Sequence, residues 1–255
     1  MAIVARYPDL AGKTVFVSGG ATGIGADIVA AFAGQKATTV FVDIDEPRGR
    51  ALAERLAAET GAHVAFLRVD VTDIPALEAA IDHAASIGGR LDVLVNNAAN
   101  DRRAPVEAVD PDAWDAAMAV NLKHQFFAAK AAHRHMTPPR GGSIVNLGST
   151  SYRLGVPNLT AYATAKSAVR GLTRQLAREW GRDLVRVNAI VPGAILTEKQ
   201  RQLWISREEE DRIVAQQCLP RALDGEDVAE LALFLASDAS RGCTSQDFVV
   251  DGGLT

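Results

Sequence analysis

Short apolar runs alternate with longer helical patterns along almost the whole chain, and this alternation limits the fold more than any other feature. Residues 14–18 and 39–43 are rich in β-branched side chains, and residues 23–34 between them follow a helical pattern. Strands that are apolar throughout are buried on both faces, which is typical of a parallel sheet covered by helices. Similar runs follow at 64–67, 91–95, 143–147, 185–188 and 248–251. We therefore expect a doubly wound α/β fold with seven parallel strands, built as one domain over residues 1–255.

The composition is that of an ordinary globular protein. Hydrophobic residues make up 48% and charged residues 23% of the 255 positions, and the net charge is -4. These values give no reason to expect nucleic acid or an anionic membrane as a partner. No apolar stretch is long enough to span a bilayer, and the first residues lack a signal-peptide pattern. Cys218 and Cys243 have no metal-ligand spacing, so we expect no metal site. Two cysteines also do not make a disulfide framework, so we expect a reducing, cytoplasmic setting.

One segment interrupts the alternation. Residues 197–223 form a long, charged stretch between the sixth and seventh expected strands. In sheets of this type, ligands bind beyond the carboxyl ends of the strands. An insertion at that edge is a candidate substrate lid.

A glycine-rich turn follows the first expected strand. Gly19, Gly23 and Gly25 have the spacing G-x-x-x-G-x-G and lead into the first expected helix. Glycines permit a tight turn and let the backbone approach a pyrophosphate, whose charge the helix N-terminus stabilises. The alternative is a glycine-rich turn that binds no ligand.

Asp43 stands at the end of the second expected strand, about 20 residues after the glycine turn. A carboxylate at this position accepts hydrogen bonds from the ribose hydroxyls of an adenosine and repels a 2′-phosphate. No arginine or lysine stands at Ser18 or Ile44. We therefore expect NAD rather than NADP as the cofactor, although Asp43 alone also fits a surface turn.

Tyr162 and Lys166 lie four residues apart in a helical pattern, so their side chains share one face. A neighbouring ammonium favours the phenolate and is expected to lower the pKa of the tyrosine. The pair is then a candidate for proton transfer near neutral pH. The same spacing also occurs by chance in many helices.

The glycine turn and Tyr162-x-x-x-Lys166 together resemble the short-chain dehydrogenase/reductase family, with its Rossmann-type fold. The resemblance runs from about residue 10 to residue 253. Further landmarks of the family are present in the expected order: Asp70-Val71, Asn96-Asn97-Ala98-Ala99, Asn121, Ser149, Pro192-Gly193, Thr197 and Asp251-Gly252-Gly253.

The resemblance implies a role for each matching residue. Tyr162 would be the general base in oxidation, Lys166 would hold the nicotinamide ribose, Ser149 would orient the substrate oxygen, and Asn121 would support a proton path. Besides Tyr162 and Lys166, the cofactor would be bound by Gly19, Thr22, Gly23, Ile24, Gly25, Asp43, Asp70, Val71, Asn97, Ala98, Pro192, Gly193, Ile195 and Thr197.

Local motifs look like the aldose 1-dehydrogenase branch of the family, such as bacterial D-xylose dehydrogenases. They are Asn100 to Arg103, Gly148 to Tyr152 and residues 197–204 with 215–219. A sugar site needs many hydrogen-bond partners and a flat apolar face. Besides Ser149 and Tyr162, the candidates are Asn100, Arg102, Ser151, Tyr152, Gln200, Arg201 and Trp204. Alternatively, these are surface residues that share no site.

The expected reaction is NAD-dependent oxidation of an aldose at C1 to its lactone. Pentoses and hexoses such as xylose, arabinose and galactose are all candidate substrates. The alternatives are a reductase of oxoacyl thioesters, another alcohol or polyol dehydrogenase, and a non-catalytic dinucleotide sensor. The family resemblance also implies a homotetramer, or else a dimer, assembled through the helices at about 113–135 and 158–180.

Overall fold

The computed structural model describes residues 5–198, 200 and 206–255. Seven strands form one sheet in the order β3-β2-β1-β4-β5-β6-β7, and every neighbouring pair is parallel. The strands are β1 (Thr14–Ser18), β2 (Thr38–Asp43), β3 (Val64–Arg68), β4 (Val93–Asn96), β5 (Gly142–Leu147), β6 (Val185–Pro192) and β7 (Asp247–Val250). The expected doubly wound sheet is confirmed, and its order reverses between β1 and β4, where such folds form a ligand crevice.

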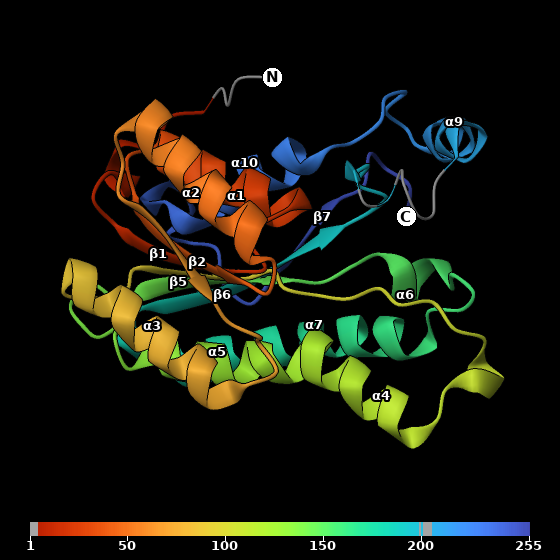
Figure 1. Cartoon of the computed structure of the whole chain (residues 1–255), viewed down its shortest axis with the longest axis horizontal. Helices are drawn as coiled ribbons and strands as arrows, with labels where there is room; N and C mark the ends of the chain where they lie inside the picture. The colour runs from red at the N-terminus through yellow and green to blue at the C-terminus, as the bar shows by residue number, and fades with distance from the viewer. Residues whose placement is uncertain (1–4, 199, 201–205) are drawn as a thin grey trace.

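Helices cover both faces of the sheet (Figure 1). The helices α1, α2 and α10 pack on one face, and α3, α5 and α7 pack on the other. Their bounds are α1 (Gly23–Gly34), α2 (Glu46–Thr60), α3 (Ile74–Gly88), α4 (Pro111–Met118), α5 (His124–His133), α6 (Ser151–Leu154), α7 (Thr160–Trp180), α9 (Arg207–Gln216) and α10 (Gly225–Ala236). Single turns of 3₁₀-helix are η1 (Pro8–Leu10), η2 (Val106–Ala108), η4 (Gly181–Asp183) and η5 (Asp238–Ser240). In the described parts of the chain, no helix is both long and apolar enough to cross a membrane.

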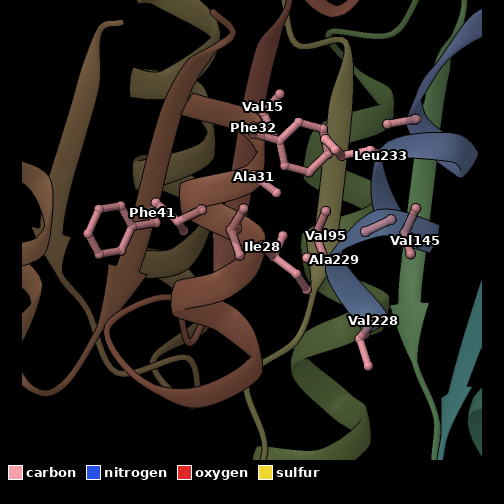
Figure 2. Packing of buried hydrophobic residues seen from close by; sticks show 14 of the residues in the cluster. Val15, Ile28, Ala31, Phe32, Phe41, Val95, Val145, Val228, Ala229 and Leu233 are labelled. Atoms are coloured by element: carbon pink, nitrogen blue, oxygen red, sulfur yellow. The ribbon is translucent and has the colours of Figure 1, made fainter. Parts of the chain in front are cut away.

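Each face of the sheet has its own hydrophobic core. On the first face, Phe32 of α1 and Leu233 of α10 pack over Val15 of β1, and all three are fully buried (Figure 2). Burying a side chain of this size contributes about 1.5–3 kcal/mol. The two cores hold the strands rigidly, so the loops at their carboxyl ends start from fixed positions.

Two expected strands differ from the structure at their ends. The run at 91–95 becomes strand only from Val93, because the Asp92 side chain turns to accept a hydrogen bond from the Thr14 backbone N–H at 2.9 Å. The run at 185–188 continues to Pro192, because β6 pairs with β5 on one side and with β7 on the other.

The helix expected at 113–135 is interrupted. A π-helical turn, η3 (Ala119–Lys123), lies between α4 and α5 and contains the buried Asn121. Turns of this kind are rare and frequently occur at functional sites.

The two ends of the expected lid segment are joined to each other by backbone contacts. Ile195 and Leu223 form an isolated parallel bridge, and the Leu196 N–H donates to the Leu223 carbonyl at 2.9 Å. The segment between them is therefore an excursion from the carboxyl end of β6. At its far end, the Leu219 N–H donates to the Gly252 carbonyl at 2.9 Å.

Candidate active site

The glycine turn after β1 leaves no room for larger residues. Gly19 has a φ of +68°, which favours glycine. A Cβ atom on Gly25 would lie 1.9 Å from the Gly19 carbonyl oxygen and 2.6 Å from Asn97 Nδ2. The turn therefore packs its backbone against itself and exposes backbone groups at the mouth of the crevice.

The N-terminus of α1 differs from those of its neighbours. The Asp45 and Asp73 side chains cap α2 and α3, whereas Thr22 makes no side-chain cap and the first turn of α1 has no acidic residue. An uncapped helix start presents backbone N–H groups and the positive end of the helix dipole. These groups fit an anionic group such as a pyrophosphate.

Asp43, the last residue of β2, is hydrogen-bonded to the glycine turn that follows β1. One carboxylate oxygen accepts a hydrogen bond from the Ala21 N–H at 3.0 Å, and the other accepts one from the Asp45 N–H at 3.1 Å. Arg68 lies beside Asp43 in the strand register, and its Nε is 3.9 Å from the carboxylate of Glu46. The carboxylate of Asp43 is partly exposed and retains acceptor capacity for hydroxyl groups.

The loops after β3 and β4 lie at the same edge of the sheet as the glycine turn. Asn97 Nδ2 donates to the Gly19 carbonyl at 2.8 Å, so this side chain fastens the glycine turn to β4. Asp70 accepts from the Thr72 hydroxyl at 2.7 Å, while Val71 and Ala98 are buried.

The loop after β6 reaches the same place. A Cβ atom on Gly23 would lie 3.2 Å from Thr197 Cγ2, so the Thr197 side chain lies against the glycine turn. A Cβ atom on Gly193 would lie 2.6 Å from Asp251 Cβ, which explains the glycine after Pro192. Apart from Tyr162 and Lys166 on α7, the residues predicted to bind the dinucleotide thus lie at the carboxyl edge of the sheet, on the loops that leave it or in the first turn of α1.

Tyr162 and Lys166 share one face of α7, as expected. Lys166 Nζ is 5.8 Å from the centre of the Tyr162 ring and donates to the Leu147 carbonyl at 2.7 Å. The Ser149 side chain lies close enough to the Tyr162 hydroxyl to lower its pKa. The structure therefore brings together the tyrosine, lysine and serine that the sequence motif suggested.

The pKa of Tyr162 moves in the direction opposite to our expectation. Burial raises it to about 12, the nearby Ser149 side chain acts against this rise, and the negative charge of Asp101 adds to it. Burial also lowers the pKa of Lys166 to about 7. Lys166 is therefore only partly charged near neutral pH, so its field at the phenol does not overcome the effect of burial.

Asn121 holds the loop that follows β4. Its Oδ1 accepts a hydrogen bond from the Asn100 N–H at 2.9 Å, and its Nδ2 donates to the Asn100 carbonyl at 3.0 Å. The π-helical turn makes this possible because it directs Asn121 inward from a helix that otherwise packs on the sheet. Asn121 thus fixes the position of Asn100 at the start of this loop.

Two buried polar residues, His124 and Gln125, were not predicted. The Gln125 amide lies between the carbonyls of Asn121 and Leu147, 3.4 Å from each. His124 Nε2 is 3.0 Å from the Ala98 carbonyl, and burial lowers the pKa of this histidine to about 3. Their position, one turn after Asn121, was the available signal, but polar residues on a helix are usually exposed.

The proposed sugar-binding residues are only partly brought together. Gln200 Nε2 donates to the carboxylate of Asp101 at 2.9 Å, which joins the lid segment to the loop after β4. Ser151 is buried near Ser149, whose hydroxyl accepts from its N–H at 3.1 Å. Tyr152 accepts a hydrogen bond from Arg153 at 3.2 Å. The side chains of Asn100 and Arg102 are exposed, and Arg201 and Trp204 lie outside the described residues.

Comparison with known proteins supports an enzymatic role. A family profile described as "Enoyl-(Acyl carrier protein) reductase" matches residues 19–255. The chain is 46% identical to the "Probable galactose dehydrogenase GalD" of Rhizobium meliloti over 98% of its own length and 97% of the relative's. It is 43% identical to the D-xylose 1-dehydrogenase of Caulobacter vibrioides over 98% of each chain.

A solved structure agrees with these relatives. A short-chain type dehydrogenase/reductase from Mycobacterium ulcerans matches with a TM-score of 0.91 and 30% identity, over 98% of this chain and 91% of that one. Sequence and fold therefore lead to the same group of proteins.

Proposed function

The chain belongs to the short-chain dehydrogenase/reductase family, and we propose that within this family it oxidises aldose sugars at C1 with NAD. Its membership makes it an oxidoreductase that acts on CH–OH groups of small molecules and uses a nicotinamide dinucleotide. The choice of aldose and of NAD goes further and is our proposal.

The proposed dinucleotide site lies along the carboxyl edge of the sheet. The N–H groups at the start of α1 would hold the pyrophosphate, and Asp43 would accept hydrogen bonds from the adenosine ribose. When bound, the dinucleotide supplies the hydride acceptor. Asp43 supports NAD because its carboxylate repels a 2′-phosphate, whereas the neighbouring Arg68 lies close to Glu46.

The protein's own groups would handle the proton. In its phenolate form, the Tyr162 oxygen would take the proton of the C1 hydroxyl and become the neutral phenol, and Ser149 would orient that hydroxyl through a hydrogen bond. Lys166 lies one turn away on the same face of α7, and its ammonium, together with the positive charge of a bound oxidised nicotinamide, would lower the pKa of Tyr162 and favour the phenolate. Asn121 keeps the loop after β4 in place beside these groups.

The observation that carries the proposal is that Lys166 and Ser149 both lie beside Tyr162, with Lys166 Nζ 5.8 Å from the Tyr162 ring centre. This grouping supports the proposal because a hydroxyl that could orient the substrate then lies beside a candidate base, at the same edge of the sheet as the uncapped N-terminus of α1. The aldose substrate rests on the two relatives named for galactose and D-xylose oxidation, and on the polar residues near Tyr162.

A substrate panel tests the proposal. Galactose, xylose and arabinose, each with NAD and with NADP, are compared with a simple alcohol and an acetoacetyl thioester, while the absorbance of the reduced cofactor is followed. We expect turnover of at least one aldose, with NAD preferred. Activity on the alcohol or the thioester without activity on any sugar would exclude the aldose assignment.

Tyr162→Phe tests the mechanism on the best substrate of the panel. Loss of the proton acceptor should reduce kcat by at least about a hundredfold. Tyr7→Phe is the matched control, because Tyr7 packs against the core beside α1, away from Tyr162. Full turnover by Tyr162→Phe would contradict the role given to this residue.

A further inference from the structure

Asp101 lies in a loop that is anchored at both ends beside the proposed reaction centre. Before it, both backbone groups of Asn100 are bound by the Asn121 side chain at 2.9 and 3.0 Å. After it, the Ala104 N–H donates to the carbonyl of Asn158 at 2.9 Å. Asn158 comes two residues before α7 begins, and Tyr162 lies in the first turn of that helix. The loop is therefore held against the element that carries the reacting tyrosine.

The Asp101 side chain reaches the segment that follows Thr197. Its Oδ2 accepts a hydrogen bond from Gln200 Nε2 at 2.9 Å, and Gln200 belongs to the segment that leaves the sheet beyond Thr197. The side chain is half-buried. Its charge raises the pKa of Tyr162, which places the carboxylate within electrostatic reach of the phenol.

Among the described residues, three other groups near Tyr162 are neutral or only partly charged near pH 7. Ser149 is neutral, burial keeps His124 neutral near pH 7, and burial lowers the pKa of Lys166 to about 7. Arg102 and Arg103 follow Asp101 in the same loop, with exposed side chains. Among the described residues, Asp101 is thus the carboxylate whose charge raises the pKa of Tyr162.

We propose that Asp101, held by Gln200, is a specificity-determining residue that accepts hydrogen bonds from substrate hydroxyls and excludes substrates with a carboxylate. The proposal rests on the proposed function, because it assigns the substrate class of the same site. An ionised carboxylate acts only as a hydrogen-bond acceptor and not as a donor. Hydrogen bonds to it are stronger than hydrogen bonds between neutral groups. The same charge disfavours an anionic substrate in a partly desolvated site, which is selection by repulsion.

Asp101→Asn tests the proposal, because asparagine has the same shape and removes the charge. The assay compares kcat/KM for a neutral aldose with kcat/KM for the uronate of the same configuration. We expect the preference for the neutral sugar to fall by at least about tenfold, equivalent to about 1.4 kcal/mol. Asp101→Ala, which removes the acceptor altogether, should raise KM for the neutral sugar about tenfold or more.

The pH profile provides a second readout that a purely structural role would not change. Asp101 raises the pKa of Tyr162, so Asp101→Asn should lower that pKa. The rise of kcat/KM with pH should therefore begin at lower pH than in the parent enzyme. Glu107→Gln is the matched control: it removes one charge from η2, on the same stretch between β4 and α4, and should leave both readouts unchanged.

The outcomes separate this proposal from the proposed function. If the parent enzyme oxidises an aldose but Asp101→Asn keeps the parent preference and pH profile, the role of Asp101 is wrong and the function stands. If the parent enzyme oxidises no sugar, the function fails. The pH profile is then measured on whichever alcohol the enzyme oxidises, and an unchanged profile also overturns the role of Asp101. Melting temperatures of all variants show whether each one is folded.

Discussion

Gly25→Ala tests whether the glycine turn is shaped as the structure shows. The added Cβ would lie 1.9 Å from the Gly19 carbonyl oxygen and 2.6 Å from Asn97 Nδ2. Ordinary contacts of a Cβ begin near 3.4 Å, so the turn must open. Forcing a methyl group into such a packed position costs about 1–3 kcal/mol. In a chain of this size, that corresponds to a fall in Tm of several degrees, at about 2–4 °C per kcal/mol.

Dinucleotide binding should suffer more than stability. The opened turn displaces the backbone N–H groups at the start of α1 that would hold the pyrophosphate. We expect Kd for NAD to rise at least about tenfold, equivalent to about 1.4 kcal/mol. Calorimetric titration with NAD measures this effect, and thermal unfolding measures the first one.

Gly34→Ala is the matched control at the other end of the same helix. A Cβ on Gly34 would meet nothing within 4 Å. Alanine is favoured over glycine in helices by up to about 1 kcal/mol, so this variant should be as stable as the parent or more so and should bind NAD normally. The reasoning is refuted if Gly25→Ala binds NAD with the parent affinity and melts at the parent temperature.

Two further predictions concern single carboxylates. Asp43→Ala should lower the ratio of kcat/KM with NAD to kcat/KM with NADP by at least about tenfold, because the charge that repels the 2′-phosphate is lost; steady-state kinetics with both cofactors measures this ratio, and an unchanged ratio would contradict the role of Asp43. Asp27→Asn should stabilise the protein by about 1–2 kcal/mol at pH 7–8, because burial, with Glu226 and Asp224, raises the pKa of Asp27 to about 6. As the pH rises from the ordinary aspartate pKa to about 6, ionisation of Asp27 therefore lowers the free energy of unfolding. Denaturant unfolding should show that the stability difference between Asp27→Asn and the parent disappears near pH 4.

Local patterns predicted the elements that are buried on both sides. The expected bounds of β1 and α1 are those observed, because a β-branched run and a glycine-flanked helical pattern both mark their own ends. The start of β4 was misplaced because it depends on a side-chain contact between Asp92 and the backbone of Thr14. Strand order also required the structure, since it is a property of pairing between distant segments.

The relative positions of the motif residues could be predicted where one residue type does one task, whereas their roles stay predictions. Gly19, Gly25 and the Tyr162–Lys166 pair stand where the motif put them, and their geometry agrees with the expected arrangement. The direction of the Tyr162 pKa was wrong, because burial cannot be read from a four-residue spacing. Asp101 was passed over for a related reason, since its contact with Gln200 joins segments about a hundred residues apart.

The most direct test of the proposed function follows the hydride itself. The enzyme is supplied with NAD and an aldose that carries deuterium only at C1, and the reduced cofactor and the sugar product are examined by mass spectrometry. Our account predicts deuterium in the reduced nicotinamide and an unlabelled lactone. Deuterium that stays in the sugar while unlabelled NADH accumulates would show oxidation at another carbon and would contradict it.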